Sequence, residues 1–583
     1  MTFMNKIDRS LILLPLFVLS SSILFFGSGY GYLLPFAFLG LILLFANYSY
    51  AITLLLLLSP TSAILASLSD SILSLSPSQN LKISLGMTYL LLPIAIAYFT
   101  NINLTISNLK RNILIIVPSA IFLLSFMKSQ DQLMAIFMSG DSRNHSLLIR
   151  NIVKTGFVSN DQQAFYPSYY FHIAGTIANG IGVNSPIKSS VIGLIIGYIF
   201  ACLAIVFSLA RLSELYKLST NRCILIGIPL ATSTYWGFIL MHGFYSAAWG
   251  LAVLIPAYVN LFTSNQKTRS QIFLEGSFFA LLAYHAWALL PPLILLPYLI
   301  SGILMSGKKS RPSIKYVLPL IFFTVFSYVK VNHEGSLERV ITLLKTDGGI
   351  SDISFTTAFA IFLLLILILK ANKASELGLA FAAVFVATLI MFLTIGFLRR
   401  STGTFVGYYN QKLLWIITAA VIPILVIALI SLVDLKLISG FSVPLLISAI
   451  ILFSTSLTPL QNITLKLQAT KWSGPSPNIV EKVFSLDNSL FSGKRIIFWY
   501  FEDPGNDRIG TFWSSSLSNE VHSALKFNEI AAWAYSETGQ VVELCSVLSN
   551  SERTLIVTRN KSQILIGLNN ECAEKVNLVD FIN

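Results

Sequence analysis

Charged residues are scarce in this sequence. Only 11% of its 583 residues are Asp, Glu, Lys or Arg, whereas a soluble domain carries about 25%. Hydrophobic residues make up 55% of the chain, and its mean hydropathy is +0.74. This composition excludes a soluble globular protein. It indicates a mostly α-helical, polytopic membrane protein.

Cysteine is also scarce, because the chain contains only four. Cys202 and Cys223 fall in or beside apolar segments, whereas Cys545 and Cys572 lie in a polar tail. The latter two could pair only if the tail lies outside the cytoplasm. The sequence also lacks zinc-ligand spacing, a P-loop, a glycine-rich dinucleotide turn and a nucleophile elbow. No metal site is therefore expected from a motif, and a requirement for a divalent cation stays open.

Apolar runs long enough to cross a bilayer recur along the chain, at roughly 20 residues per span. They fall near residues 11–27, 31–47, 50–68, 85–100, 112–128, 188–210, 222–240, 246–263, 272–289, 290–306, 315–331, 354–370, 376–397, 413–432 and 437–456. The first run follows Lys6 and Arg9 without a small-x-small cleavage site, so we expect a retained anchor. We predict a membrane helical bundle of about 13–15 spans.

The positions of basic residues predict the orientation of these spans. Lys and Arg gather in short loops, which the positive-inside rule places in the cytoplasm. The clusters are Lys110/Arg111, Arg211/Lys217/Arg222, Lys267/Arg269, Lys308/Lys309/Arg311/Lys315 and Lys370/Lys373. They account for much of the net charge of +13, so we expect no nucleic-acid partner. A cytoplasmic N-terminus places all of them inside, provided that residues 272–306 form a hairpin turning near Pro291 and Pro292.

This orientation defines four regions of a plasma-membrane protein. We expect N-terminal transmembrane helices over 1–128, an extracytoplasmic loop over 129–187, a transmembrane core over 188–456 and an extracytoplasmic tail over 457–583. A Pro/Ser/Gly linker at 471–477 precedes the structured part of the tail. That part contains strand-like runs at Arg495–Phe501 and Thr554–Thr558 and a helical stretch at Trp513–Phe527. We predict a small α/β domain of roughly 100 residues there.

The loop at 129–187 contains a long polar interruption, Gly140 to His172. Asp141 can cap a helix over Ser142–Thr155, and Gly156 can end that helix. Neighbouring turns of one helix face carry Asp141, His145, Ile149 and Ile152. The pattern is typical of a helix at a membrane surface, with a carboxylate and an imidazole near its start.

Positive charge on the expected outer face, against the usual bias, indicates an anionic ligand. Arg399, Arg400 and Lys412 lie there and suit a lipid phosphate. A carboxylate at the same surface suits transfer of a sugar from such a phosphate. Asp141 would act as the general base that deprotonates the acceptor hydroxyl. Direct activation of the acceptor implies inversion at the anomeric carbon.

The residues Asp141 and Arg143-Asn144-His145 resemble the first external loop of GT-C superfamily membrane glycosyltransferases. Tyr166-Pro167 and His172 fit the same loop. The segment Tyr408 to Trp415, YYNQKLLW, is similar to one in actinobacterial arabinofuranosyltransferases and related membrane proteins. The resemblance covers roughly residues 130–420. It implies a GT-C-like bundle, a polyprenyl-phosphate sugar donor and an extracytoplasmic glycan acceptor of the cell wall or cell surface.

The candidate site follows from these two arguments together. We assign Asp141 and His145 to catalysis. The candidate substrate-binding residues are Arg143, Tyr166, His172, His285, Arg399, Arg400, Tyr408, Tyr409 and Lys412. The expected partners are the lipid-linked donor, the glycan acceptor and membrane lipids.

Simpler roles stay open for several of these residues. Asp141 is also compatible with a role as a helix cap alone, and His145 with a position on the surface. Lys412 is compatible with a lysine at a helix end that extends its ammonium toward water. Tyr408 and Tyr409 also suit an aromatic belt. Other functions stay open too: a flippase or transporter of lipid-linked glycans, a glycan polymerase or ligase, or a membrane anchor for a wall-binding tail. A transporter should carry polar residues at mid-membrane, whereas the polar residues here crowd one face.

Overall fold

The computed structural model describes residues 4–99, 108–113, 142–158, 169–182, 186–218, 244–287, 289–304, 355–372, 374–400, 403–434, 495–499, 554–558 and 576–580. Within these residues the protein is mostly α-helical, as predicted. Four helices have stretches long and apolar enough to cross a membrane: Tyr48–Leu73, Ser189–Leu215, Ser375–Arg399 and Tyr408–Ser431. They indicate a multi-pass membrane protein.

Wherever the described residues cover a predicted apolar run, that run is helical. The first group of helices is α1 (Met4–Phe26), α2 (Leu34–Phe45), α3 (Tyr48–Leu73) and α4 (Pro77–Phe99). The second is α9 (Pro186–Leu215), α12 (Tyr245–Leu261), α13 (Arg269–Ala286) and α14 (Pro291–Leu304). The third is α17 (Phe355–Ala371), α18 (Ser375–Arg399) and α19 (Tyr408–Asp434). The runs predicted at 112–128, 222–240, 315–331 and 437–456 lie almost wholly outside the described residues.

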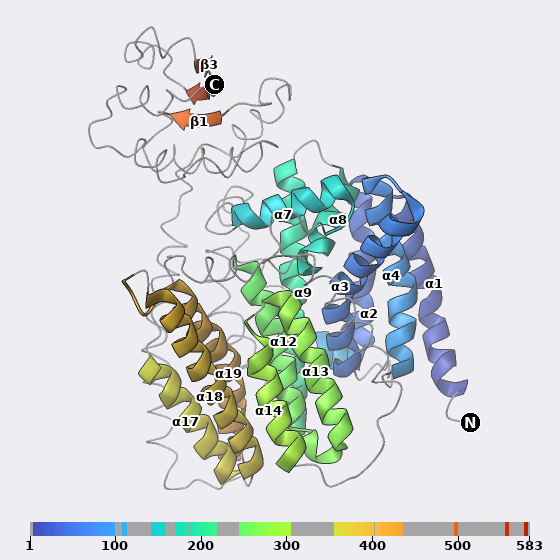
Figure 1. The fold of residues 1–583 in the computed structure, drawn as a ribbon. Helices are drawn as coiled ribbons and strands as arrows, with labels where there is room; N and C mark the ends of the chain where they lie inside the picture. The colour runs from blue at the N-terminus through green and yellow to red at the C-terminus, as the bar shows by residue number, and fades with distance from the viewer. Residues whose placement is uncertain are drawn as a thin grey trace.

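These helices run side by side, and three short elements cross one end of them (Figure 1). The short elements are α7 (Ser142–Thr155), the single turn η2 (Tyr169–Phe171) and α8 (His172–Ile181). The N-terminus lies at the opposite end, so we call the two ends the N-terminal end and the α7 end (Figure 1). The pair α13 and α14 packs together as the hairpin predicted at Pro291.

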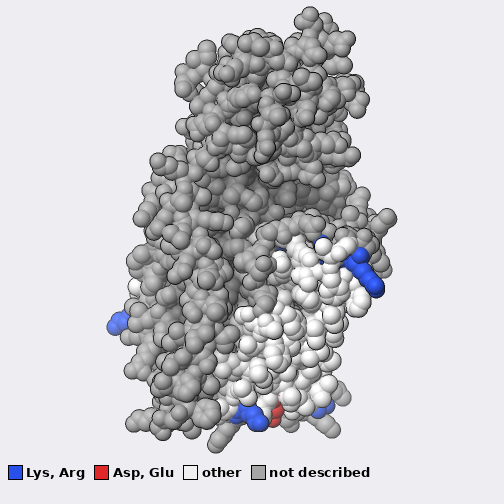
Figure 2. Space-filling view, turned by 90° about the vertical axis from the view of Figure 1, so that its left-hand side faces the viewer, with Lys and Arg blue, Asp and Glu red and all other residues white. Residues whose placement is uncertain are grey.

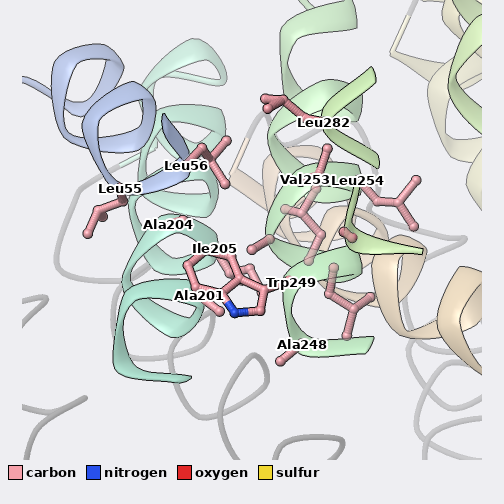
Figure 3. Close-up of a cluster of buried hydrophobic side chains, with 14 of the residues drawn as sticks. Leu55, Leu56, Ala201, Ala204, Ile205, Ala248, Trp249, Val253, Leu254 and Leu282 are labelled. Carbon is pink, nitrogen blue, oxygen red and sulfur yellow. The ribbon is translucent and has the colours of Figure 1, made fainter. Parts of the chain in front are cut away.

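The centre of the bundle is an apolar core formed by α3, α9, α12 and α13 (Figure 3). Trp249 from α12 lies among small and branched side chains such as Ala201 and Ile205 from α9 (Figure 3). These side chains are almost wholly inaccessible. Small residues on facing helices let the backbones approach closely, which is how helices associate where lipid is the solvent.

Basic residues from three of the predicted clusters meet at the N-terminal end. The Arg111 guanidinium pairs with Glu214, and Arg211 donates a hydrogen bond of 2.6 Å to the Asn260 side chain. Lys267 pairs with Glu275 at 2.7 Å and also donates to the Asn260 carbonyl. Figure 2 shows Lys, Arg and acidic atoms at the lower end of one face, further Lys or Arg atoms at the upper right and left edge, and a mostly uncharged surface between them. The described basic residues of these three clusters therefore lie at the same end of the helices.

The helix predicted at Ser142–Thr155 is present as α7. The alternative of a surface position for His145 is wrong, because its side chain is completely inaccessible. His145, Ile149 and Ile152 are all buried against neighbouring elements. Gly156 follows the last helical residue with a left-handed backbone, at a φ of 81°. An added Cβ at Gly156 would lie 2.7 Å from the Cα of Pro77, so only glycine fits this close turn.

The tail contributes three described strands, which form a parallel sheet in the order β1-β2-β3. They are β1 (Arg495–Trp499), β2 (Thr554–Thr558) and β3 (Val576–Asp580). Strands were predicted at the first two positions, and the third was missed. Its sequence, VNLVD, contains Asn and Asp, which are depleted in strands. The predicted helical stretch at 513–527 lies outside the described residues.

Candidate functional site

A hydroxyl group in the middle of α3 holds the segment that leads into α8. The Ser59 hydroxyl is directed at the carbonyls of Tyr169 and Tyr170, at 2.8 and 3.2 Å. The same oxygen accepts a hydrogen bond of 3.1 Å from the Ile173 backbone amide. The backbone of η2 and the first turn of α8 is therefore fixed from inside the bundle.

The side chains of η2 extend this anchoring to two other helices. The Tyr170 ring stacks on Trp249 of α12, with their centroids 4.4 Å apart. The Tyr169 ring meets His285, in the last turn of α13, edge to face at 4.5 Å. His285 is almost fully buried. We call the rings of Tyr169, Tyr170, Phe171, Trp249 and Tyr245 and those that contact them the aromatic layer under α7. The predicted site residue His285 belongs to this layer.

The predicted catalytic residue His145 lies in the same layer. Its ring stacks on Phe171 at 4.6 Å and meets Tyr245 edge to face at 5.4 Å. The side chain is completely inaccessible. This arrangement makes His145 a contact between α7, η2 and α12. It favours a role in positioning α7 over direct contact with a substrate.

His172 begins α8 and is also completely inaccessible. Neither ring nitrogen has a hydrogen-bond partner among the residues that the structure describes. Burial lowers the pKa of the His172 imidazole to about 3. The ring is therefore neutral at pH 7.

Aromatic rings from three segments surround the predicted phosphate ligand Lys412, in the first turns of α19. The Lys412 ammonium lies 4.5 Å from the Phe244 ring centroid, 5.1 Å from that of Tyr408 and 5.8 Å from that of Trp287. It also donates a hydrogen bond of 3.1 Å to the Tyr408 hydroxyl. Only 3% of the residue is exposed. We call these four residues the Lys412 box.

The Lys412 box adjoins the layer under α7. Phe244 precedes Tyr245, which contacts His145, and Trp287 follows two residues after His285. Tyr409 stacks on Trp287 at 6.4 Å and meets Tyr408 at 5.0 Å. The structure therefore brings Lys412, Tyr408, Tyr409, His285 and His145 into one cluster at the α7 end.

Arg399 and Arg400 are adjacent in sequence but lie in different environments. Arg399 is completely inaccessible and donates a hydrogen bond of 3.1 Å to the Thr404 hydroxyl. Gly407 packs on its guanidinium so closely that an added Cβ would lie 2.1 Å from Cζ. Arg400 is exposed. Arg399 therefore supports the turn before α19, and the side chain of Arg400 faces outward.

Asn410 completes the support of this turn. Its side chain accepts a hydrogen bond of 3.2 Å from the Gly407 amide and donates one of 2.7 Å to the Phe392 carbonyl of α18. These bonds tie the start of α19 to α18 and so fix the backbone that carries Lys412.

Three predicted site residues cannot be placed in this cluster. Asp141 and Tyr166 lie outside the described residues, and so does the side chain of Arg143. The described helix α7 nevertheless begins at Ser142, directly after Asp141.

Sequence reasoning missed three residues that build the cluster: Ser59, Phe244 and Trp287. Ser59 stands within a run of apolar residues and directly before Pro60, which was the one available signal for it. Phe244 lies two residues before the predicted span 246–263, and Trp287 lies near the end of the predicted span 272–289. An aromatic belt is the ordinary expectation at both places.

The described residues contain no group of three or more His, Cys, Asp or Glu side chains that could hold a metal ion. The buried polar groups of the cluster are imidazoles, hydroxyls, one ammonium and one guanidinium. Such a set suits the binding of an anion better than the binding of a cation.

Comparison of the chain with protein-family models, curated proteins and solved structures gives no match.

Proposed function

We propose that this protein is a multi-pass membrane glycosyltransferase. It transfers a sugar from a polyprenyl-phosphate donor to the hydroxyl of a glycan acceptor at the α7 end. The observation that carries this proposal is the buried Lys412 ammonium, enclosed by aromatic rings at the end where α7 begins beside Asp141.

The Lys412 box suits the phosphate of the donor. Rings facing an ammonium stabilise it by about 0.5–2 kcal/mol, which offsets part of the cost of burying the charge. A phosphate would add a charge-assisted hydrogen bond, worth roughly 1.5–3 kcal/mol. The aromatic faces of Trp287 and Tyr409 suit the apolar prenyl chain or the C–H face of a sugar. Arg399 acts by holding the turn before α19.

Asp141 is the general base in this proposal. Its carboxylate takes the proton of the acceptor hydroxyl as the acceptor oxygen attacks the anomeric carbon. The bond from that carbon to the phosphate oxygen breaks, and the phosphate leaves with the electron pair. Lys412 stabilises the charge on the leaving phosphate, and attack from the opposite side inverts the anomeric centre. His145 holds α7 through Phe171 and Tyr245.

The proposed topology places the N-terminal end in the cytoplasm and the α7 end outside. The basic residues Arg111, Arg211 and Lys267 meet at the N-terminal end, where the positive-inside rule expects them. The tail, with its parallel strands, is then an external α/β domain, to which we assign the positioning of the acceptor.

A transport function has less support, because of where the buried charges lie. Arg399 and Lys412 are the fully buried charged residues of the described part, and both belong to the α7 end. A transporter site would be expected nearer mid-membrane. The location of both buried charges at the α7 end favours a reaction at one face of the membrane over transport across it.

The deciding experiment compares Asp141→Asn with Asp70→Asn in purified, reconstituted protein. Asp70 lies in the last turn of α3, on the same end as α7, and serves as the matched acidic control. With a panel of polyprenyl-phosphate sugars, we expect Asp141→Asn to reduce transfer at least about 10²-fold. Asp70→Asn should transfer normally. Full transfer by Asp141→Asn would refute the role of the base. Transbilayer movement of the donor without any glycosylated product would instead establish a flippase.

A further inference from the structure

A cavity lies at the N-terminal end, between α3, α9, α12 and α13, away from the proposed donor site. Its volume is small, about 60 Å³, and it is partly open to the surroundings. The cavity can therefore hold only a small head group, and the rest of a larger ligand must lie outside it. The lining residues used below are Leu56, Leu57, Arg211, Asn260, Phe278 and Phe279.

Two of the described basic residues near this cavity are paired with carboxylates. Glu214 is paired with Arg111, and Glu275 is paired with Lys267. Arg211 lines the cavity, lies within electrostatic reach of both carboxylates and donates one hydrogen bond, to Asn260. A guanidinium has five N–H donors, and the described residues account for one of those of Arg211, which leaves others for a ligand. The polar part of the cavity therefore suits an anion.

Most of the rest of the lining is apolar, apart from the hydroxyl groups of Ser49, Thr53 and Ser208. Leu56 and Leu57 of α3 line the cavity together with Phe278 and Phe279 of α13. Leu56 also belongs to the core drawn in Figure 3, so this wall continues into the hydrophobic interior. Leu57 and Phe278 are only partly buried. A ligand with its anionic head at Arg211 can therefore lay an aliphatic chain along Leu57 and Phe278.

We propose that this cavity binds an anionic amphiphile, with its head on Arg211 and its chain along the apolar wall. The head is an oxyanion, either the phosphate of a phospholipid or the carboxylate of a fatty acid. It accepts hydrogen bonds from the Arg211 guanidinium and from the amide nitrogen of Asn260. The site belongs to the leaflet at the N-terminal end. It is independent of the glycosyl-transfer proposal, since its residues are separate from the Lys412 box.

The test is a lipid titration of the full-length protein in phosphatidylcholine nanodiscs, followed by native mass spectrometry. The probes are phosphatidylglycerol, oleate and inorganic phosphate, each added separately. Arg211→Gln removes the head contact, and Leu57→Trp fills the space for the chain. Arg269→Gln is the matched control, because Arg269 is exposed at the same end and does not line the cavity. A thermal melt of each variant verifies its folding.

We expect one phosphatidylglycerol or one oleate to be retained, and the preferred probe identifies the head. Arg211→Gln should weaken retention about tenfold, as loss of a charge-assisted hydrogen bond implies. Leu57→Trp should also weaken it, whereas Arg269→Gln should change it less than about twofold. An equal loss of lipid retention in Arg211→Gln and Arg269→Gln would mean that retention depends on surface charge in general. That result would overturn the proposal. Tight binding of inorganic phosphate alone, or retention unchanged in Leu57→Trp, would also overturn it.

Discussion

The Lys412 ammonium lies 4.5 Å from the centroid of the Phe244 ring, although the two residues are far apart in sequence. This contact joins the start of α19 to the start of α12 and places a cation in a nearly inaccessible position. The start of α19 is thus held by an aromatic contact to α12 as well as by its bonds to α18.

Replacing Lys412 with Gln should weaken donor binding about tenfold or more, through loss of a charge-assisted bond to phosphate. Arg400→Gln is the comparison, since Arg400 is exposed and its charge is screened. We expect that variant to lose less than about threefold. Equilibrium binding of a polyprenyl-phosphate sugar to each variant in detergent measures the difference. Equal losses would move the phosphate contact away from the Lys412 box.

Ser59→Ala should destabilise the protein by about 1–3 kcal/mol, because the carbonyls of Tyr169 and Tyr170 lose their buried donor. Ser62, one turn further along α3, is a close control. It is completely inaccessible, and its hydroxyl has no partner among the described residues. Ser62→Ala should therefore be neutral or stabilising. The apparent melting temperatures of the two variants check this. Similar values would show that the Ser59 bonds carry no net stability.

Gly407→Ala should disrupt the turn before α19, because the new methyl group would overlap the Arg399 guanidinium. Gly40→Ala in α2 meets no neighbouring atom and should be tolerated. The double variant Gly407→Ala/Arg399→Ala tests the cause, since removing the guanidinium makes space. We expect the two changes to be non-additive in the free energy of unfolding. Additive losses would mean that the contact is not the reason for glycine at 407.

The buried His172 predicts a loss of stability in acid. Its pKa is about 3 in the folded protein and about 6.5 when unfolded. Above about pH 6.5 both states are neutral and stability is unaffected. As the pH falls from about 6.5 toward 3, only the unfolded state gains a proton. Stability then declines by up to about 1.4 kcal/mol per pH unit.

Melting curves between pH 7 and pH 4 test this decline. His172→Gln removes the titrating group, so its curve should be flatter than that of the unaltered protein. Ser59→Ala changes the same region without changing a titrating group and should keep the original slope. An unchanged slope in His172→Gln would assign the acid sensitivity to other groups.

The proposed topology predicts the labelling of two single-cysteine variants, Asn160→Cys and Ser310→Cys, in a background without the four native cysteines. An impermeant thiol reagent added to intact cells should modify position 160 and leave position 310 unmodified. In permeabilised cells the reagent should modify both positions. Labelling of 310 but not of 160 would reverse the topology and move the proposed reaction to the other face.

Much of the helical layout could be predicted from the sequence, because hydrophobicity and short-range signals determine it. The helix Ser142–Thr155 was predicted from Asp141 before it and Gly156 after it, and these bounds are the ones found. The strand Val576–Asp580 was missed because five residues of mixed polarity carry little periodic signal.

The construction of the candidate site could not be predicted, because it depends on contacts between distant segments. Nothing in the local sequence of Lys412 indicates that Phe244 and Trp287 face it. Likewise, no sequence pattern pairs Ser59 with η2, or separates the buried Arg399 from the exposed Arg400. Such pairings follow from how helices pack, which sequence periodicity alone does not specify.

The helix α8 packs on α3, α4, α7 and α9 and is buried along almost its whole length. Its Gly175 faces Ile152 of α7 so closely that an added Cβ would lie 2.6 Å from that side chain. Packing this tight resists sliding of α7 over α8. The wall of the site that carries α7 is thus a fixed surface, and we expect an acceptor to bind without displacing α7 from α8.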